Sequence, residues 1–220
     1  MIKACIFDMD GTVLDTIGTI TYYVNKTLSA FGIPKISEDE CKIFVGNGAR
    51  VLIERALDAR GIKDGELVLR VLSAYNEEYD KNPNYLTKPY DEIPELLSEL
   101  KKRNIAVGIV SNKPDFLTRP LAKLFFGDLV DKSVGAKDGI PLKPCPDAVL
   151  SMLESFGASS SECVYVGDTS VDMKTGKNAG ARLTVGVLWG FRKKEELLSG
   201  GADVLVNNPL QILDEVMKLD

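Results

Sequence analysis

The chain has 220 residues, a net charge of −5 and a hydrophobic fraction of 45%, which suit a globular protein with a substantial core. The acidic balance disfavours a nucleic-acid partner, and the absence of histidine excludes phosphohistidine chemistry, Ser-His-Asp hydrolysis and histidine metal sites. We expect a cytoplasmic protein with no membrane partner, because no apolar run reaches the length of a span and no leader precedes the first strand.

The first predicted element is a short buried strand, KACIFD at 3–8, which ends in acidic residues. The stretch that follows it contains no strand-like run, and its apolar residues recur at helical spacing. Helices are predicted there at 16–32, 38–45, 49–61 and 66–82. Ser37 and Glu40 have the spacing of a capping box before the second of these helices. A four-helix insertion at 16–85 is the economical interpretation.

Beyond the insertion, apolar runs of strand length alternate with amphipathic helical segments. Strands are predicted at 106–112, 163–168, 183–189 and 202–208, and helices at 92–104, 113–127 and 146–157. Such alternation is typical of a mostly parallel sheet with helices on both faces. The predicted fold class is α/β, with a Rossmann-like parallel-sheet core formed by 1–15 and 86–220 and an inserted helical domain at 16–85.

Polar residues appear where the apolar runs end. They are Asp8 and Asp10 after the first strand, Ser111 and Asn112 after the second, Lys143 before a helix, and Asp168 and Asp172 around the end of the third. Because a ligand site in an open parallel sheet lies at the carboxyl ends of the strands, we expect these groups to converge. A cluster of carboxylates beside a lysine and a hydroxyl predicts a phosphoryl-transfer site.

The chemistry expected of this cluster divides into four roles. Asp8 and Asp168 would share Mg²⁺, which is typically bound by one or two carboxylates together with waters and substrate phosphate. Asp8 would attack phosphorus and form an aspartyl-phosphate. Asp10 would protonate the leaving oxygen and later deprotonate the attacking water. Ser111 and Lys143 would hold the phosphate oxygens as charge redistributes.

Four motifs occur in order over nearly the whole chain: DMDGT, VSN, the lysine of KPCPD, and GDTSVD. Together they resemble the motifs of the haloacid dehalogenase-like phosphatases. The resemblance implies the same roles for Asp8, Asp10, Ser111 and Lys143. It also implies that Asp8, Asp168 and the Asp10 carbonyl hold Mg²⁺, with Asp172 as support for the metal shell. The helical insertion is similar to the family's cap, which closes over small substrates.

Within the family, FVGNGARVLIERAL, VSNKP and GDTSVDMKTGKNAGA are most similar to phosphoglycolate phosphatases, which implies a small phosphorylated metabolite, 2-phosphoglycolate, as substrate. The substrate-binding residues expected are Gly11, Thr12 and Asn112 in the core and Gly48 and Arg50 in the insertion. Arg50 is expected to meet the substrate's carboxylate beside a helix N-terminus.

Alternatives stay open at this point. Within the superfamily they are a pyrophosphatase and a phosphosugar mutase or phosphatase. From another class, a phospho-accepting receiver-type signalling module also combines an acidic cluster, a hydroxyl, a lysine and Mg²⁺ on a parallel sheet. The expected assembly is a monomer or a homodimer.

Overall fold

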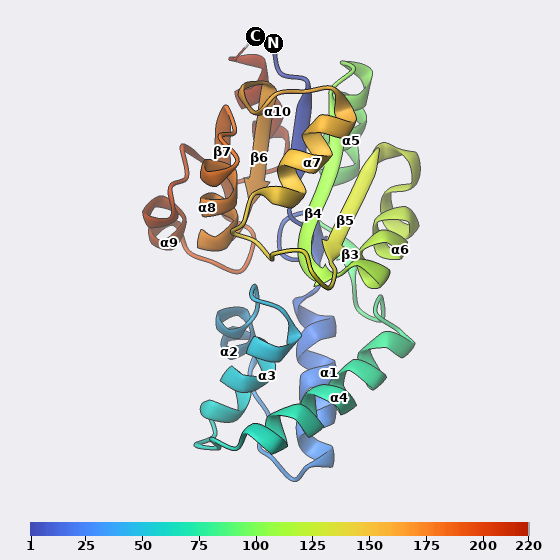
Figure 1. The fold of residues 1–220 in the computed structure, drawn as a ribbon, viewed down its shortest axis with the longest axis vertical. Coiled ribbons are helices and arrows are strands. Elements are labelled where there is room, and N and C mark those ends of the chain that lie inside the picture. Colours follow the sequence, from blue (N-terminus) through green and yellow to red (C-terminus); the bar gives the residue numbers. More distant parts are fainter. Residues whose placement is uncertain (220) are drawn as a thin grey trace. The chain divides into compact units, whose positions relative to one another are not determined.

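The computed structural model describes residues 1–219 and shows two compact units. One unit combines residues 1–15 with the chain from Pro89 onward, and the other consists of Thr16–Lys88. We call them the core unit and the helical unit (Figure 1). The chain leaves the core unit through β2 (Leu14–Asp15) and returns through β3 (Lys88–Pro89), and these two short strands form a two-stranded sheet.

A six-stranded sheet forms the centre of the core unit, in the order β5-β4-β1-β6-β7-β8. The strands are β1 (Ala4–Phe7), β4 (Ala106–Pro114), β5 (Lys132–Ala136), β6 (Cys163–Gly167), β7 (Leu183–Val187) and β8 (Val204–Val206). Every neighbouring pair is parallel, so the carboxyl ends of all six strands meet at one edge. The predicted α/β fold is confirmed, and the structure adds the edge strand β5.

Helices cover both faces of this sheet. They are α5 (Ile93–Lys102), α6 (Asp115–Phe126), α7 (Asp147–Phe156), α8 (Ser170–Asn178), α9 (Lys194–Gly200) and α10 (Leu210–Met217), with short 3₁₀ turns at Gly127–Leu129 and Ser160–Glu162. Side chains alternate along β1, so Cys5 and Phe7 pack into a core cluster with α5, α6 and α10. Ala4 and Ile6 pack with α7 on the other face. The central strand is therefore buried on both sides, which explains its continuous apolar run.

The helical unit contains α1 (Ile17–Ala30), α2 (Glu38–Phe44), α3 (Ala49–Asp58) and α4 (Gly65–Lys81). Both α1 and α3 pack against α4. Their fully buried apolar side chains are Val24, Leu28, Ile53, Ala56, Leu57 and Val71. The capping box predicted for α2 is confirmed, since Glu40 N donates to Ser37 Oγ at 3.1 Å and Ser37 N donates to Glu40 Oε2 at 2.7 Å. The four predicted helices of the insertion are therefore present.

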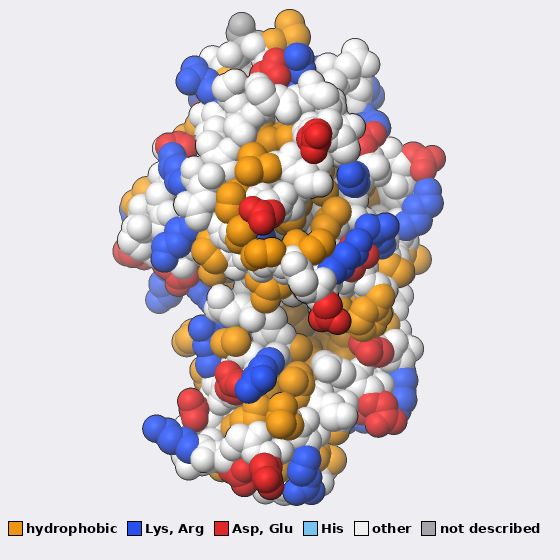
Figure 2. Space-filling view, viewed as in Figure 1, with side chains coloured by type: hydrophobic (Ala, Val, Ile, Leu, Met, Phe, Trp, Pro, Cys, Tyr) orange, Lys and Arg blue, Asp and Glu red, His pale blue; other side chains and the backbone are white. Residues whose placement is uncertain are grey.

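The surface carries charges of both signs. On the face drawn in Figure 2, lysine and arginine side chains are interspersed with acidic ones, and apolar patches lie between them. Within residues 1–219, none of the helices is both long enough and apolar enough to cross a membrane.

Candidate functional site

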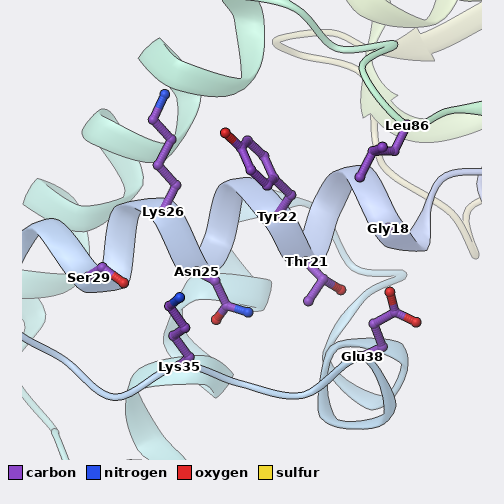
Figure 3. Close-up of a pocket in the computed structure, with 9 residues that line it drawn as sticks. All are labelled: Gly18, Thr21, Tyr22, Asn25, Lys26, Ser29, Lys35, Glu38 and Leu86. Carbon is purple, nitrogen blue, oxygen red and sulfur yellow. The ribbon is translucent and has the colours of Figure 1, made fainter.

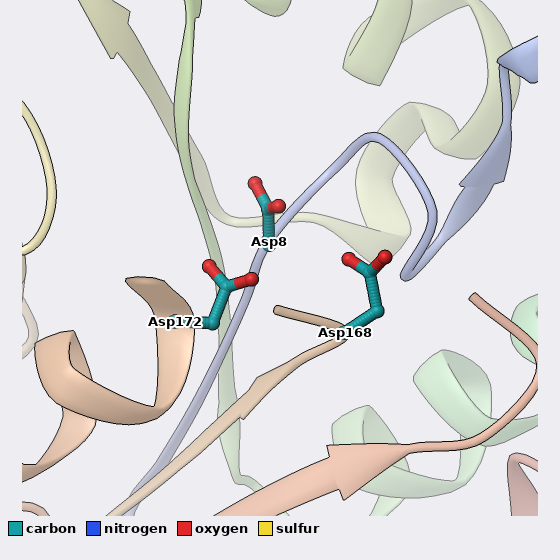
Figure 4. Close-up of side chains that lie close together, drawn as sticks. All are labelled: Asp8, Asp168 and Asp172. Carbon is teal, nitrogen blue, oxygen red and sulfur yellow. The ribbon is translucent and has the colours of Figure 1, made fainter. Parts of the chain in front are cut away.

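Three buried carboxylates lie together at the carboxyl edge of the sheet. Asp8 follows β1, Asp168 follows β6, and Asp172 lies in the first turn of α8. Each offers a carboxylate oxygen within 4.8 Å of the others, and Figure 4 shows how three separate segments of the chain supply them. We call these residues the carboxylate cluster. Its only donor atoms are hard oxygens, which suits a cation such as Mg²⁺ or Ca²⁺.

Lys143 is the cation of this site. Its buried Nζ lies 2.8 Å from Asp8 Oδ1 and donates to Asp172 Oδ1 at 2.7 Å. The side chain of Asn112 fixes the Lys143 backbone from both sides: its Nδ2 donates to Lys143 O at 3.3 Å, and its Oδ1 accepts from Lys143 N at 2.9 Å. Asn112, predicted as a substrate ligand, thus holds Lys143 in place.

The protonation of the cluster reflects its burial. Burial, and after it the charge of Asp172, raises the pKa of Asp8 from 3.8 to about 7, although Lys143 opposes this shift. Burial and the charges of Asp172 and Asp8 likewise raise the pKa of Asp168 well above its usual range. One ammonium does not balance three buried carboxylates, and a divalent cation would supply the missing positive charge. The donor atoms and the charge of the cluster therefore fit a metal ion.

Asp168 is held by contacts on both of its oxygens. The Thr12 hydroxyl donates to Oδ1 at 3.0 Å, and the Phe191 backbone N–H donates to Oδ2 at 2.8 Å. Gly11 adopts a φ of 86°, and a Cβ at this position would lie 2.4 Å from Asp168 Oδ2. Glycine is required here both for the backbone conformation and for the close approach. Gly11 and Thr12, predicted as substrate ligands, therefore lie against the side chain of Asp168, and the Thr12 hydroxyl bonds to it.

Asp172 uses one carboxylate oxygen to cap α8 and the other to bind Lys143. Its Oδ2 accepts from Thr169 N at 3.0 Å and from Thr169 Oγ1 at 2.7 Å, which completes a capping box at the start of α8. Its Oδ1 accepts from Lys143. Both oxygens are engaged by the protein, so Asp172 acts on the cluster by orienting Lys143 and through its own charge.

Asp10 and Ser111 lie beside Lys113, a residue that the sequence analysis did not single out. Asp10 is partly exposed, and Lys113 Nζ donates to its two carboxylate oxygens at 3.2 and 3.3 Å. The Lys113 side chain is only 6% exposed. Its backbone N–H donates to Ser111 Oγ at 3.2 Å. A second buried ammonium therefore accompanies the predicted acid/base residue.

The two remaining residues predicted to bind substrate, Gly48 and Arg50, belong to the helical unit. Gly48 precedes α3 with a φ of 85°, and Arg50 lies in the first turn of that helix. Arg50 Nε donates to Glu54 Oε1 at 2.8 Å, and its side chain is 67% exposed. Arg55, which the sequence analysis did not consider, donates to Phe44 O at 2.9 Å and to Asn47 Oδ1 at 3.1 Å, and so holds the glycine-rich turn before α3.

A hollow of about 480 Å³ lies within the helical unit beside α1. Figure 3 shows its lining: Gly18, Thr21, Tyr22, Asn25, Lys26, Ser29, Lys35, Glu38 and Leu86. Two of its polar side chains bind within the unit, because Lys26 Nζ donates to Glu78 Oε2 at 2.6 Å and Asn25 Nδ2 donates to Ile36 O at 2.8 Å. Among the described residues, the groups suited to catalysis gather instead in the core unit.

The chain is similar in sequence to known hydrolases and phosphatases. The family model of haloacid dehalogenase-like hydrolases matches residues 5–186. A phosphoglycolate phosphatase from Aquifex aeolicus is 32% identical over 192 residues, which cover 87% of each chain. An N-acetylmuramic acid 6-phosphate phosphatase from Pseudomonas aeruginosa is 30% identical over 216 residues, covering 97% of this chain and 94% of that protein.

A solved structure shows the same fold. The crystal structure of a protein from Lactobacillus delbrueckii subsp. bulgaricus, provisionally described as a phosphoglycolate phosphatase, has a TM-score of 0.93 at 29% identity. The match covers 97% of this chain and 98% of that one. The expectation of a phosphatase-like enzyme is confirmed, and the chain belongs to the haloacid dehalogenase-like hydrolase family.

Proposed function

We propose that the protein is a Mg²⁺-dependent phosphomonoesterase that works through an aspartyl-phosphate on Asp8, with 2-phosphoglycolate as its substrate. The observation that carries this proposal is the carboxylate cluster, buried at the carboxyl edge of the sheet with Lys143 bound to two of its members. The name shared by several relatives supports the choice of substrate.

The metal would be held by Asp8 and Asp168 together with the Asp10 carbonyl, and Asp172 would support this shell through Lys143. A bound Mg²⁺ screens the repulsion between a carboxylate nucleophile and an anionic phosphate. Thr12, Gly11 and the Phe191 N–H keep Asp168 in the orientation that this task needs. These residues are preorganised by contacts that the protein makes without substrate.

The residues of the site divide the reaction into two displacements. In the first, an Asp8 oxygen forms a bond to phosphorus while the ester oxygen leaves and takes a proton from Asp10. In the second, a water molecule gives its proton to Asp10 and attacks phosphorus, which releases inorganic phosphate and restores the Asp8 carboxylate. Lys143 and Ser111 stabilise the phosphate oxygens in both steps.

The names of the relatives point to two kinds of substrate. The relative from Pseudomonas aeruginosa acts on a sugar phosphate, N-acetylmuramic acid 6-phosphate. The core residues that would carry phosphate transfer do not distinguish this substrate from 2-phosphoglycolate. A phosphosugar mutase and a pyrophosphatase of this superfamily would use the same aspartate nucleophile. A direct comparison of turnover with each substrate therefore identifies the substrate.

A phosphate-release assay tests the proposal. The purified protein is given 2-phosphoglycolate, N-acetylmuramic acid 6-phosphate, pyrophosphate and glucose 1-phosphate, each with Mg²⁺ and with excess chelator. We expect repeated turnover that requires Mg²⁺ and is fastest with 2-phosphoglycolate. A single phosphorylation without turnover would identify a receiver-type module, and undiminished turnover in chelator would contradict the metal site. Faster turnover of another substrate would overturn the proposed specificity.

A further inference from the structure

The proposed mechanism assigns no role to Lys113, a buried cation of the core unit. Lys113 is the last polar residue of β4, directly after Ser111 and Asn112, and its side chain is almost fully buried. Its Nζ contacts both oxygens of Asp10 at 3.2 and 3.3 Å. Burying an ammonium is costly unless it has an anionic partner, and Asp10 meets this requirement in the absence of substrate.

The contact between Lys113 and Asp10 indicates where Lys113 lies relative to the reacting groups. If the proposed function holds, an Asp10 oxygen lies within hydrogen-bond distance of the ester oxygen that leaves. Lys113 Nζ contacts the same carboxylate, so it lies on the leaving-group side of the site, whereas Lys143 contacts Asp8 on the nucleophile side. The two lysines therefore serve opposite ends of a substrate.

We propose that Lys113 binds the carboxylate on the leaving group of the proposed substrate, which is a phosphate ester of a 2-hydroxy acid. In such an ester the carboxylate carbon is two bonds from the ester oxygen. A substrate whose ester oxygen meets Asp10 thus brings its carboxylate next to the neighbouring ammonium. An ammonium has three N–H donors, so it can contact Asp10 and a second carboxylate together. This inference rests on the proposed function and names the residue that binds the substrate's carboxylate.

Burial decides between Lys113 and Arg50 as the carboxylate-binding group. Arg50 is largely exposed and already pairs with Glu54, and exposed ion pairs contribute little because water screens them. Lys113 is shielded from water, where a charge-assisted hydrogen bond is stronger. Such a bond is worth roughly tenfold to a hundredfold in affinity.

The experiment measures binding, so it does not depend on turnover. The ligands are 3-phosphonopropionate, a stable analogue of 2-phosphoglycolate, and propylphosphonate, in which a methyl group replaces the carboxylate. Their dissociation constants are measured by calorimetry in Mg²⁺ buffer. We expect the unmodified protein to bind 3-phosphonopropionate roughly ten to a hundred times more tightly than propylphosphonate.

The variants locate the source of this difference. Lys113→Met should remove the difference by weakening only the binding of 3-phosphonopropionate, and Lys113→Arg should retain most of it. Lys113→Gln, which keeps a polar side chain without the charge, provides a second neutral variant if the methionine variant fails to fold. Lys3→Met removes an exposed lysine that pairs with Glu162 before β1, and Arg50→Ala removes the alternative cation; both should leave the difference intact.

Three results would overturn the proposal. The difference could persist in both neutral variants of Lys113, or both ligands could weaken alike, which would mean that Lys113 only positions Asp10. The difference could also disappear in Arg50→Ala, which would assign the carboxylate to the helical unit. A Lys113-dependent difference in a protein that releases no phosphate would instead support the binding role and contradict the proposed function.

Discussion

Loss of the metal is expected to destabilise the protein, and to do so more strongly as the pH rises. Burial and Asp172 raise the pKa of Asp8 from 3.8 to about 7 in the metal-free protein. Between these two values the folded protein holds a proton on Asp8 that the unfolded chain has lost. The stability linked to this group is therefore complete below about pH 4 and is lost as the pH rises towards 7.

The size of this loss of stability follows from the shift in the pKa of Asp8. One pKa unit corresponds to about 1.4 kcal/mol, so a change from 3.8 to about 7 costs about 4 kcal/mol of unfolding free energy at pH 8. A Mg²⁺ ion bound to the ionised Asp8 offsets this loss, because it binds the folded state and not the unfolded chain. At pH 5 the proton competes with the metal for the same carboxylate.

Urea denaturation with Mg²⁺ and with chelator measures this coupling at pH 5 and pH 8. We expect Mg²⁺ to raise the unfolding free energy by a few kcal/mol at pH 8 and by much less at pH 5. Asp8→Asn removes one of the two carboxyls with a raised pKa and should reduce the difference between the two pH values. An equal Mg²⁺ effect at both pH values, or the same pH dependence in Asp8→Asn, would refute the reasoning.

Four further outcomes are expected. Asp8→Asn should stop phosphate release while circular dichroism stays native, and appreciable turnover would exclude Asp8 as nucleophile. Asp10→Asn should lower kcat/KM for alkyl phosphates by roughly 10²- to 10⁴-fold and much less for 4-nitrophenyl phosphate, whereas equal losses would mean that Asp10 is not the acid. Ca²⁺, which is larger and accepts more oxygen ligands, should inhibit the Mg²⁺ reaction, and equal rates with either ion would contradict this. Gly11→Ala places a Cβ against Asp168 Oδ2 and should weaken Mg²⁺ binding in calorimetry; unchanged affinity in a folded variant would show that the loop adjusts.

The sequence sufficed to predict most of the sheet and of the carboxylate cluster, because both depend on local pattern. Each central strand is an unbroken apolar run, and a polar residue at the end of such a run points to the ligand edge of a parallel sheet. The edge strand β5 escaped prediction because KSVGA is short and mixed in polarity, and only Gly135 in it is buried. Its strand conformation depends on pairing with β4.

The contacts that orient the site escaped prediction for a different reason. Lys113 meets Asp10 across 103 residues of sequence, so local pattern does not distinguish it from a surface lysine. Phe191 acts through its backbone N–H, which every residue except proline carries. Thr12 and Asn112 were predicted to contact substrate; in the structure the Thr12 hydroxyl also donates to Asp168, and the Asn112 side chain also bonds to the Lys143 backbone. Only the folded chain shows which side chains meet.

The central claim is that Asp8 carries the phosphoryl group during turnover. Asp10→Asn with 4-nitrophenyl phosphate isolates this step, because the leaving group needs no acid but hydrolysis of the aspartyl-phosphate still needs a base. We predict a burst of about one nitrophenolate per active site, followed by slow turnover. Borohydride reduction and mass spectrometry of the quenched protein should then locate the modification on Asp8. Turnover without a burst, or a modification on another residue, would contradict the mechanism.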